Sequence, residues 1–157
     1  RPPISILSDG ACSFFLSRGT TSSLSYVQSR IVFDHDIQGL VEAGEGFKAL
    51  QSHLGLVRDA ALFAPTGKVQ EGCRAPFLVF FSNINDSHMR LMTTSLRLRN
   101  CQIRQSSLAS NAHVFAVDPI ISLIDFLNNE AGDGRMDLFL ISFGEHCCSC
   151  VELQYSA

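Results

Sequence analysis

The sequence contains no tryptophan and little charge. Of its 157 residues, 17% are charged and 46% are hydrophobic, and twelve are phenylalanine. A disordered acidic or basic tail needs the opposite balance of charged and apolar residues, so that class is excluded. The formal net charge of −3 does not indicate a nucleic-acid or membrane-surface partner. We therefore expect one domain over residues 1–157, with a core built from phenylalanine rings.

Long hydrophobic runs are also missing. An apolar run such as Ala75–Phe81 is far shorter than the roughly 18 residues needed to span a bilayer, so no membrane partner is expected. No signal or transit peptide is recognisable, although a chain that opens with Arg1 indicates a processed product or an excised fragment. The surplus of apolar residues predicts that other protein subunits cover part of the surface.

Cysteine usage points to an intracellular, reducing compartment. The chain has six cysteines, and three of them lie within four positions near the end, at 147, 148 and 150. Adjacent cysteines rarely pair with each other, and a chain of this length does not need disulfides, so we expect free thiols. Two alternatives stay open. Cys147 and Cys150, preceded by His146, offer half of a zinc site or a thioredoxin-type redox pair.

The first half of the chain predicts strands followed by a helix. Apolar segments separated by turn residues predict an antiparallel meander, with strands at 4–8, 12–16 and 24–33. Asp34 and Asp36 can cap the helix that the apolar spacing predicts over 37–56, centred on 42–54. A short strand is expected at 57–63.

The second half predicts a sheet with helices around it. The continuous apolar run Phe77–Phe81 is typical of a buried strand, and Asp118-Pro119 is typical of a helix start. Residues 89–104 are ambiguous, because they begin like a helix but alternate like a strand at 96–99. Further strands are expected at 113–117 and 136–143, and a final helix at 150–155. The fold class is therefore α/β, a mixed β-sheet flanked by helices.

Several short motifs carry a resemblance to a known family. The string Asp9-Gly10-Ala11-Cys12-Ser13 after an apolar strand resembles the first strand of the ribonuclease H family. Val41-Glu42, followed by Ala49-Leu50, is similar to that family's first helix, and Leu138 to His146 is similar to its last strand and histidine loop. The resemblance implies a ribonuclease H-like fold.

The same resemblance implies a metal-dependent nuclease site. Asp9 and Glu42 match the positions that bind Mg²⁺, whereas Asn83 stands where a third carboxylate is usual. Hydrolysis of a phosphodiester by two metal ions needs oxygen ligands on both, so Asp86 or Glu152 would have to complete the set. His146 matches the residue that assists product release, and the implied substrate is RNA or an RNA–DNA hybrid.

One basic stripe accompanies this site. Arg90, Arg97, Arg99 and Arg104 lie within fifteen residues, and arginines at 97 and 99 would share one face of a strand and contact phosphates. The alternative hypothesis is a pseudoenzyme, a non-catalytic scaffold or interaction subunit of a larger assembly that keeps the fold.

Overall fold

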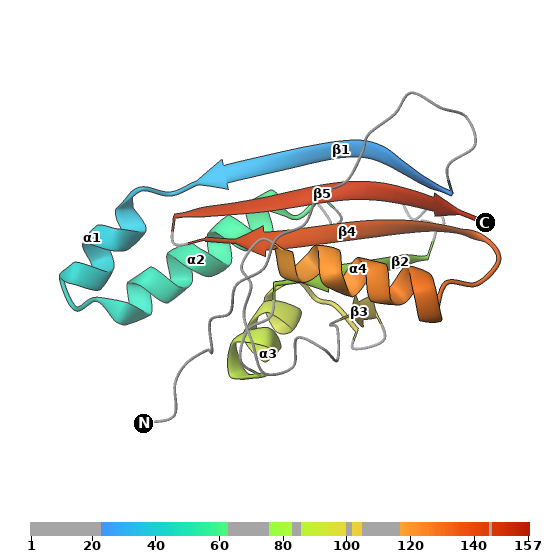
Figure 1. Ribbon diagram of the computed structural model, residues 1–157. Helices are drawn as coiled ribbons and strands as arrows, with labels where there is room; N and C mark the ends of the chain where they lie inside the picture. Colours follow the sequence, from blue (N-terminus) through green and yellow to red (C-terminus); the bar gives the residue numbers. More distant parts are fainter. Residues whose placement is uncertain (1–22, 63–75, 83–85, 100–101, 105–116, 145) are drawn as a thin grey trace.

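The computed structural model describes residues 23–62, 76–82, 86–99, 102–104, 117–144 and 146–157. In these ranges five strands form one mixed sheet, and four helices flank it (Figure 1). In chain order the elements are β1 (Leu24–Phe33), α1 (Asp36–Glu42), α2 (Gly46–Ala60), β2 (Phe77–Phe81), α3 (Asp86–Ser95), β3 (Ile103–Arg104), α4 (Asp118–Asn129), β4 (Arg135–Phe143) and β5 (Cys147–Ser156).

The sheet has the order β1-β5-β4-β2-β3. β4 and β5 form an antiparallel hairpin, and β1 pairs antiparallel to β5 on its other side. β2 pairs parallel to both β4 and β3. β1, β2, β3 and β4 therefore run in one direction, and their carboxyl ends meet at one edge of the sheet, which we call the carboxyl edge.

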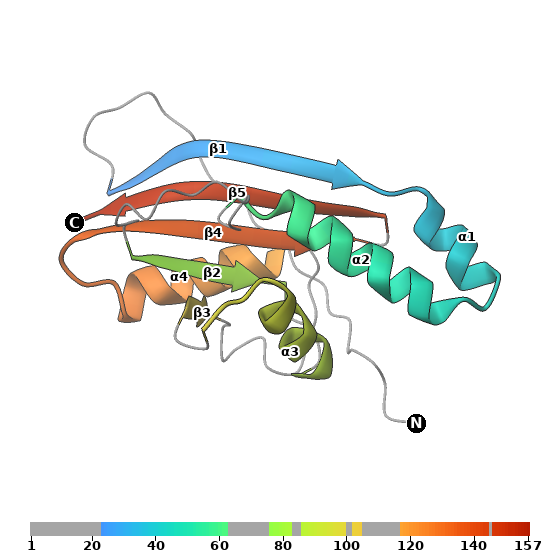
Figure 2. The same ribbon diagram turned by 180° about the vertical axis from the view of Figure 1, so that it is seen from behind.

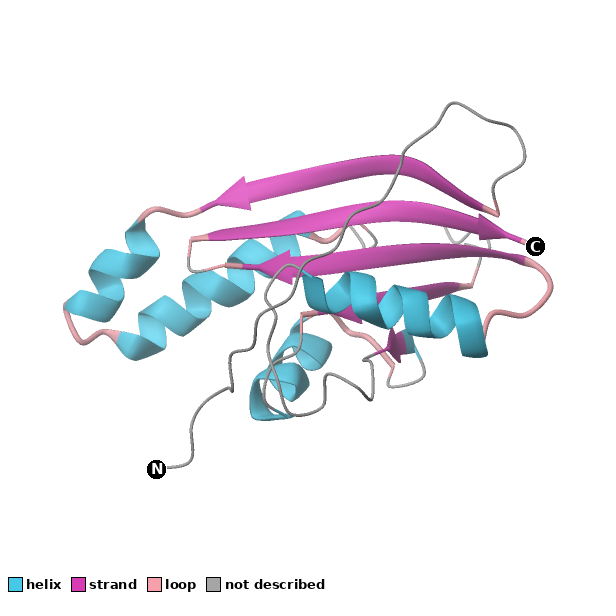
Figure 3. Cartoon of the chain, in the orientation of Figure 1, coloured by secondary structure: helices cyan, strands magenta, loops and turns pink. Residues whose placement is uncertain are grey.

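Helices cover the sheet from both sides, giving three layers (Figures 2 and 3). Alternate residues of a strand point to opposite faces, so Val79 and Phe81 contact α2 and α3 while Leu78 and Phe80 contact α4. We call these two sides the α2/α3 face and the α4 face. The α2/α3 face buries the larger cluster of apolar side chains.

Four predicted elements are confirmed. β1 and β2 have the predicted bounds, α4 begins at Asp118 with Pro119 in its first turn, and β4 spans the predicted 136–143 with one residue more. Each prediction rested on a local pattern of apolar residues or on a helix-start signal, and such patterns are sufficient where packing reinforces them.

The helical region after β1 differs from the prediction of one helix over 37–56. The chain forms α1 and α2, separated where Gly44 adopts a positive φ of 74°. Such a conformation is open to glycine and strained for other residues. The expected strand at 57–63 is wrong for the residues described, because Val57 and Ala60 lie on the buried side of α2 and continue its period. The predicted capping by Asp34 and Asp36 differs in the structure, where His35 is the N-cap residue of α1 and makes no side-chain cap hydrogen bond. Asp34, one residue earlier, accepts the Asp36 N–H on Oδ1 at 3.0 Å.

The predicted final helix at 150–155 is wrong, because these residues lie in β5. The ladder to β4 satisfies their backbone groups over the whole length of the hairpin. The predicted strands at 4–8 and 12–16, and most of that at 113–117, lie outside the described residues. In the described sheet β1 pairs with β5 from the far end of the chain.

In the described ranges, no helix has both the length and the apolar character that crossing a membrane requires.

Candidate functional site

Half-buried titratable side chains lie at the carboxyl edge of the described structure. In open α/β sheets, ligands bind outside the carboxyl ends of the strands. Two half-buried histidines meet here. His53 comes from α2 and His88 from the first turn of α3, and both lie against Phe143, the last residue of β4. We call His53 and His88 the histidine pair.

Contacts between aromatic rings position the two side chains of the histidine pair. The two imidazole centroids lie 5.4 Å apart in an edge-on arrangement, and the Phe143 ring lies 5.6 Å from His53 and 6.3 Å from His88. Among the described residues, the buried His53 Nε2 has no hydrogen-bond partner. This nitrogen is therefore available to donate to a ligand or to accept from one.

Burial keeps both imidazoles neutral. It lowers the pKa of His53, with a further contribution from His88, and it lowers the pKa of His88 as well. A neutral imidazole has one nitrogen that accepts a proton and one that donates a hydrogen bond. The pair can thus serve both as a base and as a donor near neutral pH.

Three fully or almost fully buried polar side chains lie at the same end of the fold. Ser82 follows β2 and donates its backbone N–H to the Ile141 carbonyl at 3.0 Å. Asp118 and Ser122 lie in the first turns of α4, whose amino end lies toward the carboxyl ends of β2 and β4 (Figure 1). Buried polar groups at the positive end of a helix are usual around sites that handle charge.

Of the predicted metal-binding residues, the structure describes only some. Asp9 and Asn83 lie outside the described residues, so the predicted convergence of Asp9 and Glu42 stays a prediction. Glu42 is exposed at the end of α1 and accepts a hydrogen bond from Gln38 at 2.7 Å. Asp86 is exposed at the start of α3. In the part of the chain that the structure describes, no group of three His, Cys, Asp or Glu residues could hold a metal ion.

Two further predicted residues have structural partners. His146 lies in the β4–β5 turn at the carboxyl edge, where its carbonyl accepts the Asp34 N–H at 2.9 Å. Glu152 lies on β5 and accepts a hydrogen bond from Gln28 at 2.6 Å. His146 therefore lies at the candidate site, whereas Glu152 lies within the sheet.

The arginines do not form the predicted stripe on a strand. Arg90 is exposed on α3, Arg97 lies in a turn with a φ of 54°, and Arg99 follows that turn. Arg104 lies on β3 and pairs with Glu130 at 2.9 Å. Residues 96–99, for which the sequence left helix and strand open, do not form a strand, because α3 extends to Ser95 and its end closes through a turn.

The cysteines of β5 are free thiols, as predicted for them. Residues three apart in a strand point to opposite faces, so Cys147 and Cys150 cannot act as one C-x-x-C pair. Burial raises the pKa of Cys148 to about 12 and that of Cys150 to about 11. Neither the zinc nor the redox alternative is supported by this geometry.

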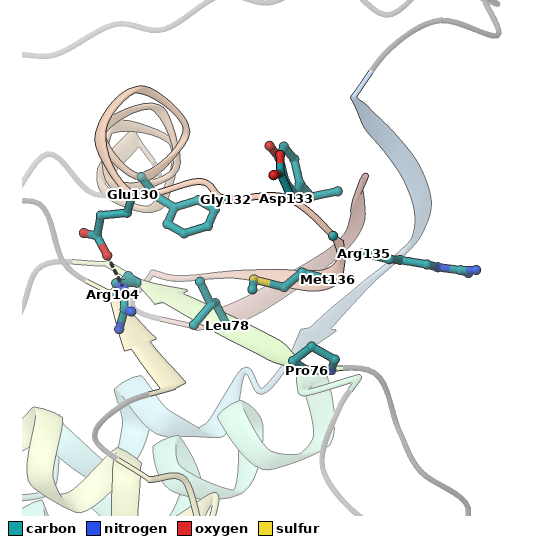
Figure 4. Close-up of a pocket in the computed structure, with 11 residues that line it drawn as sticks. Pro76, Leu78, Arg104, Glu130, Gly132, Asp133, Arg135 and Met136 are labelled. Atoms are coloured by element: carbon teal, nitrogen blue, oxygen red, sulfur yellow. Dashed lines mark hydrogen bonds and ion pairs between the residues drawn. The ribbon is translucent and has the colours of Figure 1, made fainter. Parts of the chain in front are cut away.

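A pocket of about 360 Å³ lies at the opposite edge of the sheet, near the amino ends of β2 and β4 (Figure 4). Leu78, Phe126 and Met136 are among the residues that line it. Arg104 and Glu130 pair with each other at its rim, so their charges are already compensated, and Arg135 extends away from it. The histidine pair is the better candidate, because the carboxyl edge combines perturbed titratable groups with an unpaired buried nitrogen.

Sequence reasoning missed the histidine pair. Both histidines were visible only as isolated residues, 35 positions apart. The two histidines lie on helices that follow β1 and β2, two strands that run in the same direction, and this is the signal that would have connected them. The prediction instead placed a strand after residue 56 and left 89–104 ambiguous.

Comparisons with known proteins identify the fold. No family model and no curated protein matches the chain. Among solved structures, 3-oxoacyl-acyl-carrier-protein synthase III from Aquifex aeolicus VF5 is 14% identical with a TM-score of 0.57, and the match covers 87% of this chain and 46% of that one. ChlB3, described as an acyltransferase, is 10% identical with a TM-score of 0.58, and the match covers 88% and 48%. An OleA variant from Xanthomonas campestris with cerulenin bound is 15% identical with a TM-score of 0.50, covering 84% and 38%.

These similarities overturn the ribonuclease H resemblance and the nuclease function implied by it. The matching structures are thiolase-like synthases and acyltransferases, which are neither nucleic-acid-binding proteins nor magnesium-dependent hydrolases, and they give the scaffold alternative only weak support. The motif match failed because its most specific string is five residues long, and because its supposed last helix is a strand. The chain spans less than half the length of the structures it matches, and over that span its mixed α/β fold is similar to theirs.

Proposed function

We propose that this chain forms one half of a thiolase-like acyltransferase or synthase that acts on acyl groups carried as thioesters on an acyl carrier protein. The observation that supports this is the fold. One of the matching structures is a 3-oxoacyl-acyl-carrier-protein synthase and another is described as an acyltransferase, each matched over most of this chain. Because the chain spans less than half of either structure, the activity is proposed for the protein or assembly to which it contributes.

The carboxyl edge has chemistry suited to acyl transfer. Attack on a thioester carbonyl places negative charge on its oxygen, and a fixed hydrogen-bond donor in a partly dry site stabilises that charge. A base of near-neutral pKa accepts the proton of the incoming group. Burial lowers the pKa of both His53 and His88, so each is neutral at physiological pH. Each can therefore act either as the hydrogen-bond donor to the carbonyl oxygen or as the base.

The two buried thiols of β5, those of Cys148 and Cys150, are not the attacking groups. The thiolate is the nucleophilic form of cysteine. Burial raises the pKa of Cys148 to about 12 and of Cys150 to about 11, so both are protonated near neutral pH. The proposal therefore assigns proton transfer and carbonyl binding to the histidine pair, and it assigns the acyl acceptor to neither Cys148 nor Cys150.

The test uses acyl carrier protein loaded with a defined short acyl group. The full chain is mixed with it and with a small-molecule thiol that serves as acyl acceptor. Binding is followed by fluorescence anisotropy. Transfer, which forms a thioester with the added thiol and frees the thiol of the carrier, is followed by intact-protein mass spectrometry of the carrier. The expected result is binding together with transfer, the latter reduced by about a hundredfold in His53→Ala or His88→Ala.

A matched control is His35→Ala, because His35 is exposed and its ring stacks on Phe33 rather than on the histidine pair. It should leave binding and transfer unchanged. Failure of the chain both to bind the loaded carrier and to transfer its acyl group would contradict the proposal, as would an equal loss in the His35 variant.

A further inference from the structure

The pocket of about 360 Å³ lies at the edge of the sheet opposite to the histidine pair, and we call it the amino-edge cavity (Figure 4). Three strands supply apolar side chains to it, Leu78 from β2, Met136 from β4 and Tyr155 from β5, and α4 supplies Phe126. Met136 and Tyr155 are paired in register, so they lie side by side on the α4 face. Small-molecule sites are cavities of this size with mostly apolar walls and a few polar groups.

Two aromatic rings line the amino-edge cavity. The centroids of Phe126 and Tyr155 lie 6.5 Å apart, and the rings are nearly perpendicular, at 77°. The face of an aromatic ring carries partial negative charge, so it attracts an organic cation as well as packing against apolar groups. The lining is therefore compatible with a ligand that combines an apolar body with a positive charge.

The charged side chains at the rim favour a cation over an anion. The Arg104 guanidinium donates to Glu130 at 2.9 Å and to the Ile103 carbonyl at 3.1 Å, so its charge is engaged. Arg135 extends away from the cavity (Figure 4). Asp133 also lines the cavity, is exposed, and makes no ion pair within the described ranges. Its carboxylate leaves a net negative charge at the rim.

The carboxyl end of α4 adds to this negative potential. α4 ends at Asn129, and its C-cap residue Glu130 lines the cavity. The carboxyl end of a helix carries partial negative charge, which cations stabilise, and the last turn of α4 contains no basic residue. The following loop turns at Gly134, whose φ of 128° suits glycine. The helix end and the Asp133 carboxylate thus border one cavity, and both favour positive charge.

We propose that the amino-edge cavity binds a small organic ammonium ion, meaning a protonated amine on an apolar or aromatic body. The body packs against Leu78, Met136 and the two rings. The ammonium group interacts with the Asp133 carboxylate and with the carboxyl end of α4. The proposal rests on the cavity and its charges, and it is independent of the acyl-transfer activity.

The test uses tyrosine fluorescence, because the chain has no tryptophan and only two tyrosines. Tyr26 lies on β1, outside the cavity lining, so in Tyr26→Phe the cavity residue Tyr155 is the only tyrosine. Titration of this variant with benzylammonium at constant ionic strength should give a saturable change, with a dissociation constant of about 10 mM or lower. Benzyl alcohol, which has the same ring without the charge, should bind about fivefold more weakly.

A charge reversal tests the role of Asp133. In the Tyr26→Phe background, Asp133→Lys should raise the dissociation constant of benzylammonium by about tenfold, because a repelling charge replaces an attracting one. Asp133 is exposed, so circular dichroism should show unchanged folding. The matched control is Asp59→Lys, the same change at an exposed position of α2, on the opposite face of the sheet. It should leave the dissociation constant unchanged.

Four results would overturn the proposal. The first is the absence of saturable binding of benzylammonium up to about 100 mM. The second is equal binding of benzyl alcohol, which would make the cavity indifferent to charge. The third is an equal loss of affinity in Asp59→Lys, which would reflect the overall charge of the chain. The fourth is the same saturable fluorescence change in Tyr155→Phe, which would place the ligand near Tyr26 instead.

Discussion

The two faces of the sheet are covered to very different degrees in the described structure. α2 and α3 lie over one face and bury Val79, Phe81 and Phe139 completely. The other face has α4 over β2 and β4, while Tyr26, Ile31 and Phe33 of β1 remain more than half exposed. Because burial of apolar side chains is the main favourable contribution to folding, the α2/α3 face contributes more to stability, whereas the α4 face keeps exposed apolar side chains on β1. The perturbed histidines and buried thiols also lie on the well-covered face.

The largest expected difference between the two faces is in stability. Phe139→Ala removes a ring that is fully buried on the α2/α3 face, and it should lower the free energy of unfolding by about 3–5 kcal/mol. Phe33→Ala removes the same ring from a side chain that is 61% exposed, and it should cost less than about 1 kcal/mol in the single chain. Urea denaturation of dilute protein measures both. Equal losses would refute the difference in coverage.

Thiol reactivity should differ across the two faces of β5. Burial raises the pKa of Cys148 to about 12, so it holds almost no thiolate near pH 8. Cys147, its neighbour on the α4 face, is partly exposed and should react with iodoacetamide far faster. Peptide mapping by mass spectrometry resolves the two sites, and labelling in urea should remove the difference. Fast labelling of Cys148 in the native chain would show that its side of β5 is open.

Stability should fall on mild acidification because of the histidine pair. Burial lowers the pKa of His53 and of His88 in the folded state, so the unfolded chain binds more protons below its own histidine pKa. The contribution is therefore present above about pH 6.5 and is lost as the pH falls toward the lowered values. In the double variant His53→Gln with His88→Gln, the slope of unfolding free energy against pH should flatten. A double variant that keeps the wild-type slope would contradict the assignment.

The smallest expected effect concerns the ion pair on the α4 side. Arg104 and Glu130 join β3 to the residue after α4 at 2.9 Å, with partly exposed side chains. Such pairs contribute about 0–1 kcal/mol, so Arg104→Met should change the unfolding free energy by less than about 1 kcal/mol. Urea denaturation at low and high salt checks this, since the difference should shrink with salt. A larger loss would mean that α4 is anchored by charge more than by Phe126.

The elements that sequence predicted well share a strong local pattern. β2 is a continuous apolar run and α4 begins at Asp118-Pro119, and both were found where expected. The wrong predictions concern segments whose secondary structure depends on pairing with a distant segment of the chain. Residues 150–155 form a strand because β4 and β1 pair with them from both sides, which no local pattern contains. The break at Gly44 likewise depends on how α1 and α2 pack together.

The candidate site was less predictable than the fold. A short string at residues 9–13 suggested a family, whereas three-dimensional similarity over most of the chain contradicts that resemblance. His53 and His88 become neighbours only because α2 and α3 flank the end of β4. Of the predicted site residues in the described structure, His146 lies in the turn at this edge.

Sequence alone determined that this chain has a phenylalanine-rich core, the positions of β1, β2, β4 and α4, and an α/β sheet, because each follows from contacts among residues close in the chain. The tertiary structure decided that β5 is a strand, that two distant histidines share a buried edge, and that one face of the sheet stays partly open. These depend on which distant segments pair, and the free energy of that pairing comes from the whole fold.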